Sequence, residues 1–141
     1  TLKQKLGGTD FTKCPNGLPG VEMRMPLLFS EGVLKKRISP EHFAKLTATN
    51  PAKLFGLYPQ KGSIRMGSDA DIVILDLNKK QTITHANLHE NVDYTPYEGM
   101  EILCAVDMVL SRGEVVVQNN QYTGTSARGQ FIRRNKPILD L

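Results

Sequence analysis

Residues 61–76 have the sequence KGSIRMGSDADIVILD, and this stretch decides how the chain is organised. Within Ala70–Leu77 the four residues IVIL follow one another without a polar break. An unbroken apolar run of this length predicts a strand buried on both faces. A short strand at Gly62–Met66 and a turn at Gly67–Asp69 are expected just before it.

More strands are expected after this stretch and helices before it. Residues 85–100 lack a clear period and predict a loop, and Ser111-Arg112-Gly113 is typical of a hairpin turn. The strands expected downstream are Gln81–Thr84, Ile102–Leu110, Glu114–Gln118 and Gln121–Tyr122.

Upstream of Pro59 the apolar spacing predicts three helices. The first covers about residues 21–36, with Pro26 in its first turn, where a missing N–H costs little. The second covers 40–49, because Ser39 can cap a helix whose first residue is a proline. Asn50-Pro51 repeats this start signal, and we expect a third helix over 51–56.

Composition excludes several classes of protein. The 141 residues are 40% hydrophobic and 23% charged, which excludes collagen, coiled coils and wholesale disorder. No apolar stretch approaches the ~18 to 20 residues of a membrane helix, and no secretory leader is recognisable. We therefore expect no membrane partner.

The net charge of +4 lies mostly in the last 20 residues. Few aromatic residues accompany these basic side chains, so we expect a solvated tail or a subunit contact, with no nucleic-acid partner.

Cys14 and Cys104 are too few for a disulfide framework. We therefore expect free thiols and a cytoplasmic location. Cys104 is expected to be a small buried hydrophobe.

The loop Cys14–Gly20, with the sequence CPNGLPG, is the densest candidate for function. Its prolines restrict the backbone, while Gly17, Gly20 and Asn16 are residue types that can accept a positive φ. Asn16 can donate and accept hydrogen bonds together, which complements a cyclic amide or imide. The alternative is that Asn16 only shapes the turn.

Two other groups suggest chemistry less strongly. His85 and His89 have the spacing of two zinc ligands on one helical turn, but no His-Glu-x-x-His motif surrounds them, and a solvated or hydrogen-bonded loop pair is favoured. Asp69, Asp71 and Asp76 bracket the apolar strand, where capping of turns and strand ends is favoured over catalysis or metal binding.

Residues 61–76 resemble the strand pair that follows the barrel in the amidohydrolase superfamily. Residues 10–17, 49–56 and 92–100 resemble hydantoinases and dihydropyrimidinases more narrowly, and Ser111–Gly113 and the basic tail fit the same family. The resemblance implies an α/β protein with a TIM barrel and a β-sandwich. It implies hydrolysis of a small cyclic amide in a homotetramer, with two divalent metal ions, such as zinc, bridged by a carboxylated lysine.

The family's metal ligands, which are four histidines, a lysine and an aspartate, all precede the loop that corresponds to Cys14–Gly20. A barrel takes about 250 residues, so we expect a C-terminal fragment that is inactive alone, without catalytic residues or metal ligands. Residues 1–58 would be the last barrel helices with a substrate loop at 10–20. Residues 59–122 would be sandwich strands, and 123–141 a tail that is partly disordered or at a subunit contact. Only Asn16 carries over, as a substrate-binding residue.

Two other functions stay open. The neuronal response-mediator proteins share the fold but act as scaffolds, and a free-standing β-sandwich module is a third reading. In an isolated fragment, helices that normally cover barrel strands would expose apolar side chains, so self-association is expected. These side chains are Met25, Leu28, Phe29, Phe43 and Leu46.

Overall fold

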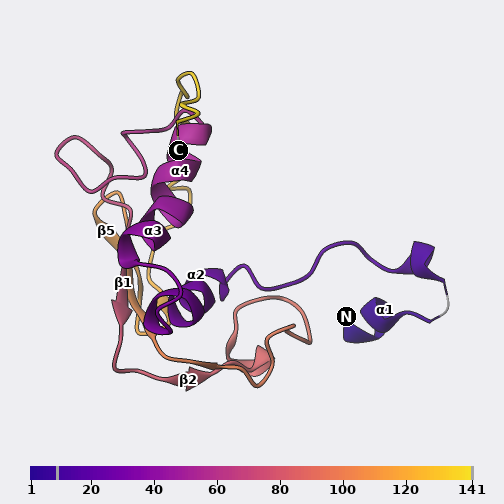
Figure 1. The fold of residues 1–141 in the computed structure, drawn as a ribbon. Coiled ribbons are helices and arrows are strands. Elements are labelled where there is room, and N and C mark those ends of the chain that lie inside the picture. The colour runs from indigo at the N-terminus through magenta and orange to yellow at the C-terminus, as the bar shows by residue number, and fades with distance from the viewer. Residues whose placement is uncertain (9, 141) are drawn as a thin grey trace.

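The computed structural model describes residues 1–8 and 10–140, which form an extended arm, two helical stretches and a small antiparallel sheet. In Figure 1 the arm, drawn in indigo, runs away from the helices and the sheet and turns back at its end. It contains the short helix α1 (Leu2–Leu6) and the 3-10 turn η1 (Phe11–Lys13). Thr1 begins α1, since its hydroxyl accepts a hydrogen bond from the Gln4 N–H at 3.2 Å.

The helix expected from residue 21 is confirmed over residues 24–34. It consists of α2 (Arg24–Leu28) and a π-helical stretch, η2 (Phe29–Leu34), and Pro26 lies in the first turn as predicted. Met23 and Leu27 are buried on its inner side against Ile83 and Ile102, and these four residues form the core. The core therefore lies between α2 and the segment around residues 83–102.

The second and third predicted helices are one continuous helical stretch. It consists of α3 (Pro40–Ala44), the π-helical η3 (Lys45–Thr49) and α4 (Asn50–Leu54). Ser39 caps it as expected, accepting a hydrogen bond from the His42 N–H at 3.2 Å. The expected restart at Asn50-Pro51 is wrong, because Thr49 keeps helical angles and the wider π-helical turn directly precedes the proline, which has no N–H to donate.

The main sheet has four antiparallel strands in the order β1-β4-β5-β6. Their bounds are β1 (Ile72–Asp76), β4 (Ala105–Ser111), β5 (Glu114–Gln118) and β6 (Gln121–Tyr122). The predicted hairpin joins β4 to β5, with positive φ at Arg112 and Gly113, as a tight two-residue turn requires.

A separate two-stranded ladder pairs β2 (Gln81–Thr82) with β3 (Glu101–Ile102). The single strand expected over residues 102–110 is therefore wrong, since Ile102 belongs to β3, Leu103 and Cys104 lie in neither strand, and β4 begins at Ala105. The loop expected over 85–100 is confirmed, apart from the short 3-10 turn η4 (His85–Asn87).

Two expectations around residues 61–76 are also wrong. Gly62–Met66 is not a strand, because the Ser63 and Ser68 hydroxyls bond the Pro59 carbonyl at 3.0 and 2.7 Å and fold this segment into turns. β1 is not buried on both faces, since it is the edge strand of its sheet and Val73 and Ile74 are each 43% exposed.

Buried polar contacts join the first helical stretch to the residues just before β4. Ser30 is fully buried, and its hydroxyl accepts a hydrogen bond from the Leu103 N–H at 3.0 Å. Cys104 is also fully buried, as predicted, and burial raises the pKa of its thiol. The predicted exposure of helix side chains applies to Leu46, which is 45% exposed, whereas Phe29 and Phe43 pack edge to face at 5.1 Å.

The tail over residues 123–140 has no helix or strand but contacts its own chain. The Arg128 guanidinium bonds the Ser111 carbonyl and pairs with Glu114, both at 2.9 Å. Further along, the Asn135 N–H donates to the Gly56 carbonyl at 2.7 Å, beside α4 (Figure 1). Whether the tail also meets another subunit stays a prediction.

Within the described residues, no helix has the length and apolarity to cross a membrane.

Candidate substrate-binding loop

The loop Cys14–Gly20 lies on the arm and is held in shape by α1. The Lys5 ammonium donates to the carbonyls of Pro15 and Gly17, the latter at 2.5 Å. The Cys14 thiol bonds the Lys5 carbonyl at 3.3 Å in the opposite direction. One lysine thus closes the turn that contains Asn16.

Asn16 is exposed at the centre of this turn. Gly17 and Gly20 have φ of 78° and 135°, as predicted, whereas Asn16 is not among the residues with a positive φ. No hydrogen bond between residues of the described chain uses the Asn16 amide, so its donor and acceptor are both available to a ligand. Lys5 and Gly17 close the turn, and the choice between substrate binding by Asn16 and a role in shaping the turn stays a prediction.

The base of the loop is at Gly20, where the arm meets the rest of the chain. The Gly20 N–H donates to Glu90 Oε1 at 2.7 Å. A Cβ at Gly20 would lie 2.7 Å from Cε2 of Tyr97, so the ring packs directly on the glycine. Sequence reasoning missed both partners, because neither Glu90 nor Tyr97 belongs to a local motif with the loop.

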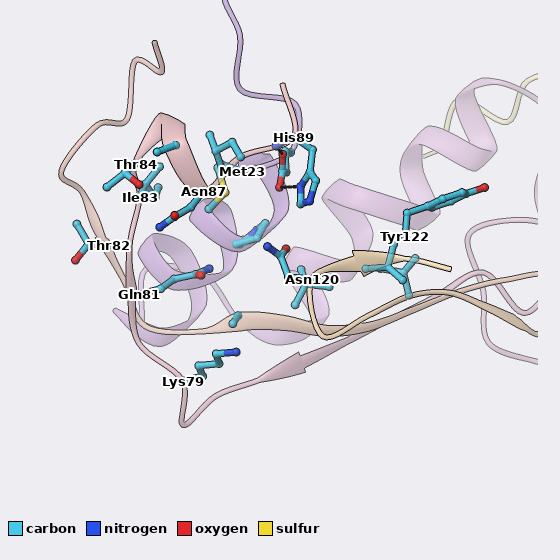
Figure 2. A pocket seen from close by; sticks show the side chains of 18 residues that line it. Met23, Lys79, Gln81, Thr82, Ile83, Thr84, Asn87, His89, Asn120 and Tyr122 are labelled. Carbon is cyan, nitrogen blue, oxygen red and sulfur yellow. Dashed lines mark hydrogen bonds and ion pairs between the residues drawn. The ribbon is translucent and has the colours of Figure 1, made fainter. Parts of the chain in front are cut away.

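The two candidate histidines contact different glutamates. His85 begins η4, and its Nδ1 lies 3.6 Å from Glu98 Oε2, while His89 lies beyond that turn with its Nδ1 2.9 Å from Glu22 Oε1. Figure 2 shows His89 and the dashed line that marks its contact. The hydrogen-bonded loop pair is the reading that this geometry supports.

The aspartates around β1 bond backbone and neighbouring side chains. Asp71 accepts a hydrogen bond from the Arg112 N–H at 2.8 Å, and Asp76 accepts one from the Asn78 N–H at 2.8 Å. Asp69 pairs with the Lys61 ammonium at 2.9 Å, and the same ammonium also contacts Asp71. These contacts are those of capped turns and strand ends.

Lys61 shifts the titration of both carboxylates. Its hydrogen bond holds the pKa of Asp69 below the usual range. Partial burial would raise the pKa of Asp71, but the bonds from Lys61 and the Arg112 N–H outweigh it and the pKa is lowered. Burial also opposes the charge on Lys61, yet its two carboxylate partners raise its pKa. The cluster is therefore a stable, fully ionised ion-pair network at neutral pH.

A cavity of about 760 Å³ lies between α2, the segment 81–89 and the main sheet (Figure 2). Its walls combine apolar residues such as Met23 and Val109 with polar ones such as Asn87 and Asn120. Asn16 does not line it. Glu22 and His89 also line it, and they pair with each other at 2.9 Å.

A catalytic metal pair does not fit the residues in hand. Over residues 1–8 and 10–140, no three side chains of His, Cys, Asp or Glu gather closely enough to hold a metal ion. No chemical step through a metal is therefore derived from this chain. What the geometry offers is one exposed amide on a loop that is tied down at both ends.

Comparison with known proteins identifies the class to which this fold and loop belong. The model of the amidohydrolase family matches residues 7–116, and the chain belongs to that family.

Within it, the chain is similar to hydantoinases. It is 52% identical to the D-phenylhydantoinase of Escherichia coli O81 (strain ED1a), over 97% of this chain and 30% of that protein. The solved D-hydantoinase of Bacillus sp. AR9 is 50% identical, with a TM-score of 0.87 over 92% of this chain and 28% of the other. The solved dihydropyrimidinase of Brevibacillus agri NCHU1002 is 49% identical, with a TM-score of 0.90 over 96% and 30%. The resemblance to hydantoinases and dihydropyrimidinases is confirmed, and the chain spans less than a third of the length of these relatives.

Proposed function

We propose that this chain is the C-terminal part of a metal-dependent cyclic amidohydrolase that opens hydantoin or dihydropyrimidine rings by hydrolysing the cyclic amide bond. The observation that carries the proposal is the 52% identity to a D-phenylhydantoinase over 97% of the chain. The agreement of the backbone with a dihydropyrimidinase, at a TM-score of 0.90, is in line with it. Since the chain covers 30% of each relative, the rest of the enzyme would lie outside it.

In this proposal residues 1–58 are the end of a TIM barrel and residues 59–122 are strands of a β-sandwich. Support comes from the change in structure near Pro59, with helices before it and antiparallel strands after it. Val73 and Ile74 are consecutive in β1 and point to opposite faces, and each is 43% exposed, so both faces of this edge strand would be open to parts of the enzyme outside the chain. Residues 123–141 would contribute to contacts in a cytoplasmic homotetramer.

Asn16 would bind the substrate ring. A cyclic amide presents an N–H donor beside a carbonyl acceptor, and a single carboxamide can pair with both. The exposed position of Asn16 and the two bonds of Lys5 that close its turn support this role. The two divalent metal ions, which we take to be zinc bridged by a carboxylated lysine, would be held by residues outside this chain, since its own do not fit them.

The test is hydrolysis of dihydrouracil and of a 5-substituted hydantoin by the complete polypeptide that contains this chain. Ring opening is measured in two ways: as the loss of the ring's absorbance and as the appearance of the carbamoyl acid product. We expect activity in the complete polypeptide and none in residues 1–141 alone. A complete polypeptide that binds divalent metal but opens neither ring, or ring opening by residues 1–141 alone, would contradict the proposal.

A further inference from the structure

The arm that carries Asn16 is fastened to the rest of the chain at a distant segment of the sequence. Its base is held by the hydrogen bond from the Gly20 N–H to Glu90 Oε1, at 2.7 Å, between residues 70 positions apart. Gly20 is buried, and the ring of Tyr97 leaves no room for a side chain on it. The backbone at Gly20 is therefore fixed from two sides.

A second contact reinforces the first. Glu22 accepts a hydrogen bond from the His89 N–H at 2.7 Å, and its other oxygen lies 2.9 Å from His89 Nδ1 (Figure 2). Two consecutive residues thus hold the base of the arm, with His89 bonded to Glu22 and Glu90 bonded to Gly20. Two neighbouring bonds define an orientation that a single bond would leave free to swivel.

The far end of the arm returns to the same segment. The Leu2 N–H donates to Asp93 Oδ1 at 2.8 Å, and Lys5, one turn further along α1, holds the carbonyls on either side of Asn16. The arm is consequently a closed loop, with both of its ends on residues 89–97.

The carboxylate of Glu90 has no other hydrogen-bond partner within the described residues. Its Oε2 is buried and accepts no hydrogen bond from the described chain, so its hydrogen bonding there is devoted to Gly20. Burying a carboxylate oxygen without a partner is unfavourable, so its placement calls for an explanation, and a role at a functional site is one.

We propose that Glu90, with Tyr97 and His89, positions Asn16 for the ring of the cyclic amide, an inference that rests on the proposed function. Asn16 lies four residues from Gly20, a reach of about 13 Å in extended chain. A small rotation at Gly20 therefore becomes a large displacement at Asn16. Misplacing a binding group by about 1 Å can cost up to a hundredfold in rate.

The experiment compares three variants of the complete polypeptide. Glu90→Ala removes the acceptor, Glu90→Gln keeps an oxygen in its place, and Glu98→Gln is the matched control. Glu98 lies in the same segment, but among the described residues the hydrogen bond and ion pair given for its carboxylate are both with His85. The readouts are kcat and KM for ring opening, and amide hydrogen exchange of residues 10–20.

In Glu90→Ala we expect KM to rise by about tenfold or more while kcat changes by less than about threefold, because Asn16 binds the ring in both ground and transition states. Exchange in residues 10–20 should quicken by about tenfold, since the arm would open more often. Glu90→Gln should restore most of both values, and Glu98→Gln should match the wild type.

The possible failures separate the two proposals. If the wild type opens no ring, the proposed function is refuted, and hydrogen exchange still decides whether Glu90 anchors the arm. If the wild type is active and Glu90→Ala equals Glu98→Gln in exchange, the anchor is refuted. If exchange quickens while KM stays unchanged, Glu90 anchors the arm but does not position Asn16, which overturns the inference.

Discussion

Replacing Gly20 with alanine tests the packing at the base of the arm. Gly20 has φ of 135°, and an added Cβ would come within 2.7 Å of the Tyr97 ring, well inside the ~3.5 to 4.0 Å of a favourable carbon contact. Holding alanine at such a φ costs about 1–3 kcal/mol. Forcing the ring aside costs about 1–3 kcal/mol more, because Tyr97 packs against the core.

Gly17→Ala is the matched control, since Gly17 has φ of 78° but no atom lies within 4 Å of its added Cβ. It should cost only the backbone term, about 1–2 kcal/mol. Both variants would be measured in the complete polypeptide by urea unfolding, together with Tyr97→Ala and the double variant Gly20→Ala/Tyr97→Ala. Removing the ring should recover about 1 kcal/mol or more of the Gly20→Ala loss. Equal losses at both glycines, with no coupling to Tyr97, would refute the packing.

Two further changes test the other contacts of the fold by urea unfolding. Ser30→Ala leaves the buried Leu103 N–H without an acceptor and should lower the free energy of unfolding by about 1–3 kcal/mol. The control Ser126→Ala changes an exposed serine and should leave the free energy of unfolding unchanged. Equal effects of the two changes would contradict the buried hydrogen bond. Lys61→Met should lower the free energy of unfolding at pH 7 by about 1 kcal/mol. Because the folded pKa of Asp71 lies below its ordinary 3.8, its stabilising effect is present above pH 3.8 and is lost as the pH falls through the folded pKa. The difference between wild type and Lys61→Met should therefore shrink in acid, and a difference that is constant from pH 7 to pH 2 would contradict the ion pair.

Features governed by local sequence were predictable. The hairpin followed from Arg112-Gly113, whose residues accept a positive φ, and the capped helix start followed from Ser39-Pro40. Asn50-Pro51 misled because a helix start has the same local signal as a proline that directly follows a π-helical turn within a continuous helical stretch.

The errors and omissions arise where contacts are distant in sequence. The apolar run of β1 predicted burial on both faces, but burial depends on what covers a strand, and within this chain β1 is an edge strand. Glu90 gave no signal at all, because its partner lies 70 residues away and a lone glutamate in a loop has no distinctive pattern. Asn16 was identified from its turn, yet the support from Lys5 could be seen only in three dimensions.

The role of Asn16 in ring binding is tested most directly by steady-state kinetics of Asn16→Ala and Asn16→Asp in the complete polypeptide. Losing both the donor and the acceptor should lower kcat/KM for dihydrouracil by about ten- to a hundredfold, because the ring's polar groups would be left unpaired. Asn16→Asp keeps acceptors but loses the donor, so it should fall between the wild type and alanine. An active wild type whose kcat/KM is unchanged in Asn16→Ala would contradict the assignment of this loop to the substrate.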